Sequence, residues 1–185
     1  MRSKTIKKID LYQYMVYIIF IVVLIFFAVW LGPSFFSRSN LLNITRQTAM
    51  VSVMAVAMTF IIASGQIDLS IGAVVALSAL ISAWLLEKTN SIALALFCAL
   101  LVGTLVGMIN GLLVTYLKIP AFLATLGMMS IIRGSAMWMT ATKAITIRNT
   151  TFNNVFGMGT IAGVPIVLLW TLIALLIGHI ALRYL

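Results

Sequence analysis

The chain has 185 residues, of which 63% are hydrophobic and only 8% are charged. Soluble domains carry about 25% charged and about 45–50% apolar residues, so this composition excludes a water-soluble globule. Six membrane helices of about 20 residues each would need about 120 residues, which is close to the apolar share of this chain. We therefore predict an all-α, multi-pass membrane protein.

The charged residues, 12 Lys/Arg against 3 Asp/Glu, give a formal net charge of +9. The basic residues Arg2, Lys4, Lys7 and Lys8 come ahead of the first apolar run. This is the positive-inside pattern of a cytoplasmic N-terminus, with anionic membrane lipid as the natural neighbour of the cluster. No basic face with interleaved aromatic residues accompanies it, which argues against a nucleic-acid partner.

Apolar runs separated by turn-forming or polar residues predict six membrane spans. We divide the chain into a basic cytoplasmic segment, 1–14, and a membrane domain, 15–185. The second and third spans are predicted to be short, about 16–17 residues or about 26 Å of helix. Strict alternation places the polar stretch 141–163 outside. The approximate spans are Met15–Leu31, Thr48–Ser64, Ile71–Leu86, Ser91–Leu117, Phe122–Thr140 and Val164–Leu182.

The polar turn between the second and third spans contains Asp68, one of only three acidic residues in the chain. A charged group near the bilayer centre costs about 2.5–3.5 kcal/mol on insertion scales, so it normally has a partner or a wet cavity. One interpretation is helix capping, in which Asp68 or Ser70 accepts hydrogen bonds from the first N–H groups of the third span and Gly65 ends the second. A second, compatible interpretation gives this turn, up to Gly72, a direct part in gating or in the passage of a solute.

The fourth and fifth spans carry further candidates. Gly103, Gly107 and Gly111 recur every four residues, so they line one helix face and favour close packing of a neighbouring helix; a solute path along that face is the alternative. Asn110 lies beside this stripe, and we expect it to hydrogen-bond to another helix. Arg133 in the fifth span indicates a re-entrant or tilted segment or an aqueous cavity, unless its side chain snorkels or pairs with a helix C-terminus.

The sequence predicts no enzyme. It holds no phosphate-binding loop, no paired carboxylates and no Ser-His-Asp set, so any ATP that drives this protein is expected to be hydrolysed in another subunit. Cys98 is the only cysteine and His179 the only histidine, so we expect no disulfide and no metal site. Both are interpreted as packed residues. Glu87 and Lys88 are interpreted as a solvated loop pair.

Several motifs together resemble a known family. Their order and spacing are similar to those of the permease subunits of bacterial ABC importers for ribose and related monosaccharides, a branch that includes importers of autoinducer-2. The resemblance covers about residues 35–185. The motifs are Asn40-Leu41-Leu42-Asn43-Ile44, Gln47-Thr48, Met54-Ala55-Val56-Ala57-Met58-Thr59, Ile67-Asp68-Leu69-Ser70-Ile71-Gly72, Pro120-Ala121-Phe122-Leu123-Ala124-Thr125-Leu126-Gly127-Met128 and Ile132-Arg133-Gly134.

The resemblance implies a permease of about ten membrane helices in the bacterial inner membrane, and we expect this chain to correspond to its N-terminal part. It also implies a second permease copy, an ATPase subunit that holds ATP and Mg²⁺, and a periplasmic binding protein near the stretch 141–163. Asp68 would organise the central helix turn, and the solute would be a monosaccharide or a related small polar molecule that the sequence does not identify. The alternatives are a self-contained six-helix carrier or channel driven by an ion gradient, and a non-transporting scaffold that binds a partner through the glycine stripe.

Overall fold

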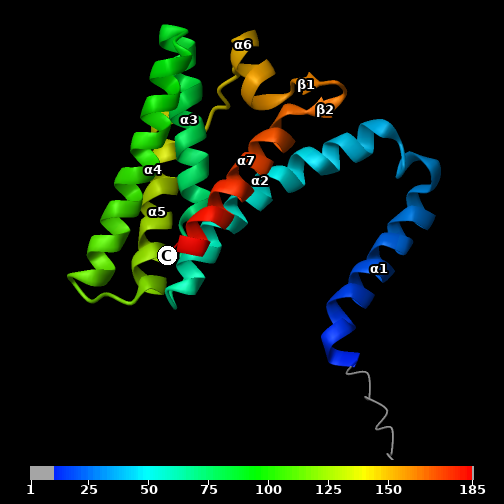
Figure 1. Cartoon of the computed structure of the whole chain (residues 1–185). Coiled ribbons are helices and arrows are strands. Elements are labelled where there is room, and N and C mark those ends of the chain that lie inside the picture. The colour runs from blue at the N-terminus through cyan, green and yellow to red at the C-terminus, as the bar shows by residue number, and fades with distance from the viewer. Residues whose placement is uncertain (1–10, 185) are drawn as a thin grey trace, which may run out of the picture. The chain divides into compact units, whose positions relative to one another are not determined.

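Long apolar helices make up most of the described chain. The computed structural model describes residues 11–184, and six helices in that range are long and apolar enough to cross a membrane. The predicted fold class and number of spans are confirmed. The basic cluster Arg2, Lys4, Lys7 and Lys8 lies outside the described residues. The six helices are α1 (Leu11–Leu31), α2 (Arg38–Ala63), α3 (Ile71–Thr89), α4 (Ile92–Thr115), α5 (Ala121–Thr140) and α7 (Ile166–Tyr184) (Figure 1).

The chain divides into two compact units, residues 1–44 and 45–185. In the first unit, α1 is followed by a 3₁₀ turn, Gly32–Ser34, and by the first residues of α2. The start of α2 is closed by polar contacts: the Asn40 N–H donates to Ser37 Oγ (3.3 Å), and Asn40 Nδ2 donates to the Phe35 carbonyl (2.8 Å). These contacts satisfy backbone groups that would otherwise lack partners at a helix end.

The prediction of a short second span is wrong, because α2 has 26 residues and begins at Arg38 rather than near Thr48. At about 1.5 Å per residue it is about 39 Å long, longer than the hydrocarbon core of a bilayer. Residues 38–47 are too polar to register as a membrane span by hydropathy, yet they continue the same helix. The span was therefore underestimated at its polar end, and α3, with 19 residues, is also slightly longer than expected.

Helices α3, α4 and α5 form a three-helix bundle in the second unit (Figure 1). Its centre is the cluster of Ala73, Val106 and Ile132, and Ala95 is fully buried beside α3. Small residues permit this close approach, which matters in lipid because apolar burial alone does not drive helices together there. Ser82 Oγ also donates to the Ala95 carbonyl (3.2 Å), which adds a polar link between α3 and α4.

Helix α7 packs against α2 within the second unit. The buried Thr171 Oγ1 donates to the Ala49 carbonyl of α2 (3.1 Å) and to Val167 in its own helix (2.9 Å). A Cβ placed on Gly178 would overlap the side chain of Val56. Glycine at position 178 therefore permits the two backbones to approach, a requirement that the sequence analysis did not identify.

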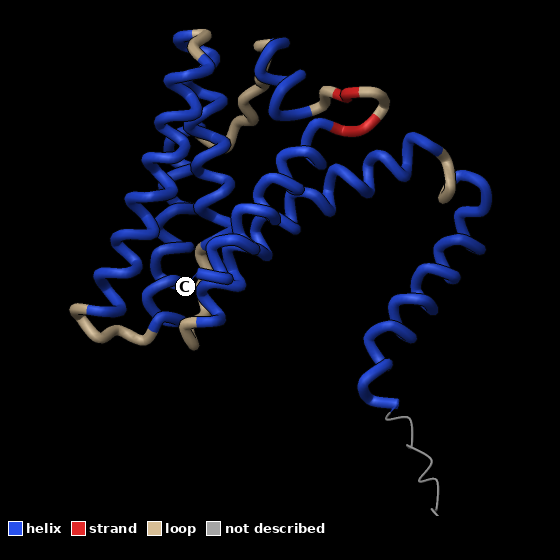
Figure 2. Tube along the Cα trace, viewed as in Figure 1, coloured by secondary structure: helices blue, strands red, loops and turns tan. Residues whose placement is uncertain are grey.

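The polar stretch 141–163 is folded. It contains a short helix, α6 (Thr150–Phe152), a π-helical turn (Asn153–Gly157) and β1 (Thr160–Ile161), which pairs antiparallel with β2 (Val164–Pro165) (Figure 2). Trp170 of α7 holds it in place: its Nε1 donates to the Val155 carbonyl (2.8 Å), and its ring stacks on Phe156 at 5.4 Å. This segment is therefore anchored to the start of α7.

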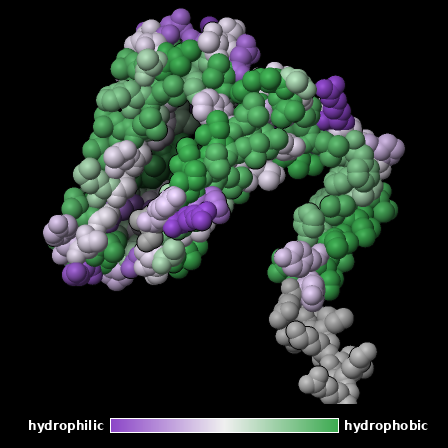
Figure 3. Space-filling view, in the orientation of Figure 1, coloured by the Kyte–Doolittle hydropathy of each residue, from purple (hydrophilic) through white to green (hydrophobic). Residues whose placement is uncertain are grey.

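Hydrophobic side chains cover the sides of the helices, and polar ones gather near the helix ends (Figure 3). Large apolar residues such as Leu100 and Ile131 are 72% and 64% exposed. In a water-soluble protein such a surface would aggregate, whereas lipid or neighbouring membrane helices cover it without penalty. The surface agrees with the membrane assignment made from composition.

Candidate functional site

The turn between α2 and α3 is built by a glycine. Gly65 has a φ of +74°, a conformation that residues with a Cβ rarely adopt. Its N–H donates to the Ile62 carbonyl (2.9 Å), and the next N–H, from Gln66, donates to the Ile61 carbonyl (3.1 Å). This pair of bonds is a Schellman motif, so Gly65 ends α2 as predicted. The chain then passes through Asp68 before α3 begins at Ile71.

Asp68 is bonded to Ser70. Its Oδ1 accepts two hydrogen bonds of 2.6 Å, from the Ser70 N–H and from Ser70 Oγ. Ser70 precedes the first residue of α3 and is completely buried. Charged acceptors form shorter and stronger hydrogen bonds than neutral ones, so this pair fixes the entry into α3. The capping prediction needs correction in its detail: the Ser70 side chain accepts no capping bond from α3, and its oxygen instead accepts a hydrogen bond from Asn110 of α4.

Asn110 joins this pair from α4. Its Nδ2 donates to Ser70 Oγ (2.9 Å), and the residue is 6% exposed. The amide orientation follows from the network: Ser70 has one hydroxyl proton, which goes to Asp68, so Ser70 Oγ can only accept from Asn110. The expected bond from Asn110 to another helix is therefore present, and it reaches a residue forty positions away.

The remaining amide oxygen, Asn110 Oδ1, is enclosed and has no hydrogen-bond partner among the described residues. Leaving such an acceptor buried and unsatisfied costs about 1–3 kcal/mol. Buried polar side chains are normally paired, so an unpaired one calls for a physical explanation.

Thr125 of α5 completes the network. The Leu69 N–H donates to Thr125 Oγ1 (3.1 Å), and that hydroxyl donates to the Ala121 carbonyl (2.8 Å). Thr125 is 3% exposed. The segment that leads into α3 is thereby tied to both α4 and α5. Thr125 lies inside a motif quoted above, but its role was missed, because threonines in membrane helices commonly bond to the carbonyl four residues earlier and give no signal in sequence.

A cavity of about 370 Å³ adjoins the network. Gly107 and Gly111 lie on its wall, and a Cβ added to either would meet nothing within 4 Å. These two glycines therefore enlarge an open space rather than pack against another of the described helices. Gly103 differs, because an added Cβ would be 4.0 Å from Val74 and Ser78 of α3. The lining residues are Ile61, Gln66, Ile67, Asp68, Gly107, Asn110, Gly111, Val114, Thr115, Ala121 and Thr125.

The other predicted site residues lie apart from this cavity. Gly72 is exposed in the first turn of α3, and an added Cβ there would also meet nothing within 4 Å. Arg133 is exposed in the second half of α5; its side chain makes no hydrogen bond within the described part of the chain and does not line the cavity. The structure thus brings together Asp68, Ser70 and Asn110 and leaves Arg133 outside the group.

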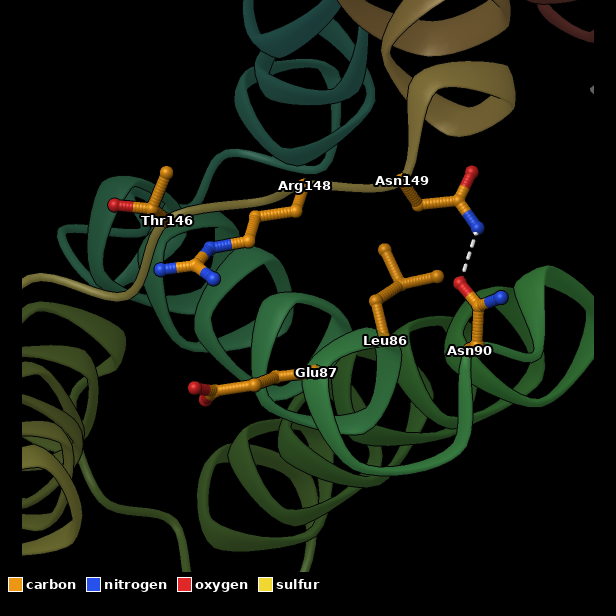
Figure 4. Close-up of a pocket in the computed structure, with 6 residues that line it drawn as sticks. All are labelled: Leu86, Glu87, Asn90, Thr146, Arg148 and Asn149. Atoms are coloured by element: carbon orange, nitrogen blue, oxygen red, sulfur yellow. Dashed lines mark hydrogen bonds between the residues drawn. The ribbon is translucent and has the colours of Figure 1, made fainter.

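A second cavity, of about 350 Å³, lies at the opposite end of α3. Asn149 Nδ2 donates to Asn90 Oδ1 (2.7 Å) across its edge, and Glu87 and Arg148 extend toward the same side of the opening (Figure 4). Glu87, interpreted from sequence as one of a loop pair with Lys88, therefore lies in a polar recess formed with the stretch 141–163. This recess could not be predicted from the sequence, because it depends on how that stretch folds back.

Six apolar helices and a buried polar network define an all-α, multi-pass membrane protein. Residues 40–184 match the family described as the permease component of the branched-chain amino acid transport system, and the chain belongs to this permease family. The family resemblance drawn from its motifs is confirmed. No solved structure matches the chain.

The relatives are sugar permeases. The chain is 39% identical to the ribose import permease protein RbsC of Haemophilus influenzae over 79% of its own length and 46% of that protein. It is 37% identical to the fructose import permease protein FrcC of Rhizobium meliloti, over 74% of this chain and 38% of the relative. It is 39% identical to the galactofuranose transporter permease protein YtfT of Escherichia coli, over 72% and 38%. The chain spans less than half the length of each of these relatives.

Proposed function

We propose that this chain forms part of the membrane-spanning permease of an ABC importer that carries a monosaccharide or a similar small polar solute across the bacterial inner membrane. The observation that supports this most directly is its kinship with ribose, fructose and galactofuranose permeases. The cavity beside Asp68 and Asn110 adds physical support, because a polar solute crossing an apolar bundle needs polar groups that are held in place in advance.

In this proposal the energy comes from a separate ATPase subunit that binds ATP and Mg²⁺. A periplasmic binding protein delivers the solute, and a second permease copy completes the pathway. The N-terminus is cytoplasmic, so the stretch 141–163 and the recess at Glu87 and Arg148 face the binding protein. The turn at Asp68 and the cavity beside it then lie toward the cytoplasmic ends of the helices.

The test is solute uptake into proteoliposomes that contain the permease carrying this chain, co-purified with its ATPase and binding protein. We expect uptake of radiolabelled ribose or another monosaccharide that requires ATP and is lost with an ATPase variant unable to hydrolyse it. The 185-residue chain alone, under a proton or sodium gradient, is the control. Gradient-driven flux through that chain without any ATPase would favour the self-contained carrier instead.

The scaffold alternative makes a different prediction. If the glycine stripe served only to bind a partner, Gly107→Leu would abolish association while no solute flux was ever observed. Gly107 lines open space in this chain, so under the proposed function Gly107→Leu instead fills the cavity and lowers uptake while the complex still assembles.

A further inference from the structure

We infer that the polar recess between the end of α3 and the stretch 141–163 is a binding site for a monosaccharide or a similar neutral polyhydroxy molecule. The identity of this ligand rests on the proposed function, whereas the site is built by side chains of this chain. Three features point to it: two opposite charges that line the recess without pairing, a wall that hydrogen bonds hold in place, and a volume suited to a small molecule.

Glu87 and Arg148 bring a carboxylate and a guanidinium to the same recess from different elements. Glu87 belongs to the last turn of α3 and Arg148 to the segment before α6, and both side chains extend toward the same side of the opening (Figure 4). Both are exposed, and neither side chain has a hydrogen bond or a salt bridge within the described residues. The carboxylate is therefore free to accept hydrogen bonds from a ligand, and the guanidinium is free to donate them.

The segment that carries the guanidinium is held in place by hydrogen bonds. Asn149 Oδ1 accepts from the Phe152 N–H (2.7 Å), and its Nδ2 donates to Asn90 Oδ1 at the end of α3 (2.7 Å). Just before it in the chain, the Ile147 carbonyl accepts from Asn153 Nδ2 (3.0 Å). These bonds join one wall of the recess to the other before any ligand binds. A site that is ordered in advance loses less conformational entropy on binding, which favours affinity.

The lining favours a neutral ligand that both donates and accepts hydrogen bonds. A simple anion would be repelled by Glu87 and a simple cation by Arg148, whereas a hydroxyl group can donate to the first and accept from the second. The volume of about 350 Å³ lies within the range of about 300–1,000 Å³ that is usual for small-molecule sites. A sugar presents hydroxyl groups and C–H faces, which match the rest of the lining. That lining consists of three polar residues and one apolar residue: Asn90, Thr146, Asn149 and Leu86.

Protection of a cysteine in the recess tests this site. The 185-residue chain is prepared with Cys98→Ala and Thr146→Cys, so that its only thiol lines the recess. The rate of reaction with a methanethiosulfonate is then measured without sugar, with D-ribose and with D-fructose. We expect at least one of the two sugars to slow labelling at position 146 several-fold. In the same Cys98→Ala background, Met158→Cys should react at an unchanged rate, because Met158 is 70% exposed and lies outside the recess lining.

Glu87→Ala and Arg148→Ala should each abolish the protection, because each removes one of the two charged partners. The matched controls are Lys88→Ala and Lys143→Ala, which remove exposed charges from the same helix and the same polar stretch but lie outside the recess lining. Protection should persist in both. Saturation-transfer NMR of the same sugar with the unaltered chain is a second measurement, which does not depend on Thr146→Cys. The transfer should be present with the unaltered chain and lost in Glu87→Ala.

The inference is overturned if neither sugar protects position 146 and no saturation transfer is observed, or if protection is unchanged in both Glu87→Ala and Arg148→Ala. Glycine is the competing ligand, because its zwitterion carries both charges but no hydroxyl group, and protection by glycine with none by either sugar would also overturn the inference. Failure of the proposed function would look different: ATP-driven sugar uptake would be missing from the complete importer although a sugar still protected position 146. Absence of protection alongside normal ATP-driven uptake would refute the site and leave the importer intact.

Discussion

Replacing Asp68 tests the network most directly. In Asp68→Ala both hydrogen bonds from Ser70, which is completely buried, are lost. A hydrogen bond to a charged group contributes about 1.5–3 kcal/mol, and a buried donor left unsatisfied costs about 1–3 kcal/mol. The Ser70 hydroxyl can rotate to a new partner, whereas its N–H cannot. We therefore expect Asp68→Ala to lower the free energy of unfolding by about 2–4 kcal/mol.

Asp68→Asn separates charge from geometry. The amide keeps an acceptor at Oδ1, but neutral hydrogen bonds are about half as strong as charge-assisted ones, so the expected loss is about 1–2 kcal/mol. For chains of about 150–250 residues, 1 kcal/mol corresponds to about 2–4 °C in Tm. On that scale Asp68→Ala should melt about 4–16 °C below the wild type, with Asp68→Asn between the two.

The assay is thermal unfolding of the detergent-solubilised chain, followed by the fluorescence of its 4 tryptophans. Glu87→Ala is the matched control, because it removes an exposed carboxylate that the structure shows in no hydrogen bond within the described residues. It should change stability by no more than about 0.5 kcal/mol. If Asp68→Ala has the same Tm as the wild type, or if Glu87→Ala lowers the Tm by as much as Asp68→Ala does, the reasoning about the buried network is wrong. In the complete importer, Asp68→Ala should also reduce assembly or uptake, and uptake at the wild-type level would contradict that role.

Four further predictions concern helix packing and orientation. Gly178→Ala should destabilise the chain by about 1–3 kcal/mol in the same melting assay, because the new methyl group meets the stiff side chain of Val56. Gly134→Ala, where an added Cβ meets nothing within 4 Å, should be neutral or stabilising by about 0.5–1 kcal/mol. Thr171→Val should lower the free energy of unfolding by about 0.6 kcal/mol, because the hydrogen bond to Ala49 of α2 is lost. Thr104→Val removes a hydroxyl that bonds only within its own helix, so it should leave the free energy of unfolding unchanged. Equal effects of the two substitutions would exclude a contribution from the interhelical bond. Alkaline phosphatase inserted after Ala144 should be active in cells, because the stretch 141–163 is expected to lie outside. An inactive phosphatase fusion, together with a fluorescent protein that is active at the same site, would contradict the cytoplasmic N-terminus.

The spans and the α2–α3 turn could be predicted because both depend on local properties. Hydropathy along the chain indicates which segments lipid can cover. Gly65 indicates the end of α2, because glycine readily adopts the positive φ that such a helix end requires. Asp68 was identified as a partnered residue because an isolated charge between apolar helices is costly. The start of α2 was missed because residues 38–47 are polar, and a polar helical segment carries no hydropathy signal.

Contacts between distant helices were only partly predictable. Asn110 had to find a partner on another helix, but nothing in the sequence identified Ser70 as that partner. Gly178 and Thr171 carry the packing of α7 on α2, yet single small residues in an apolar helix form no pattern. The regular spacing of Gly103, Gly107 and Gly111 placed them on one face correctly, but whether that face packs or opens depends on what lies opposite. Gly103 meets α3, whereas the other two line a cavity.

The network also constrains how this part of the protein can move. The segment 67–70 is bonded to Asn110 of α4 and to Thr125 of α5, and both of these side chains are almost completely buried. Separating these helices would leave several polar groups unsatisfied together, each at about 1–3 kcal/mol. The bond from Thr171 to Ala49 and the close approach at Gly178 join α7 to α2 separately. In the proposed importer, a change of access is therefore less costly if it leaves α3, α4 and α5 together at this end and bends the chain at Gly65, where α2 stops.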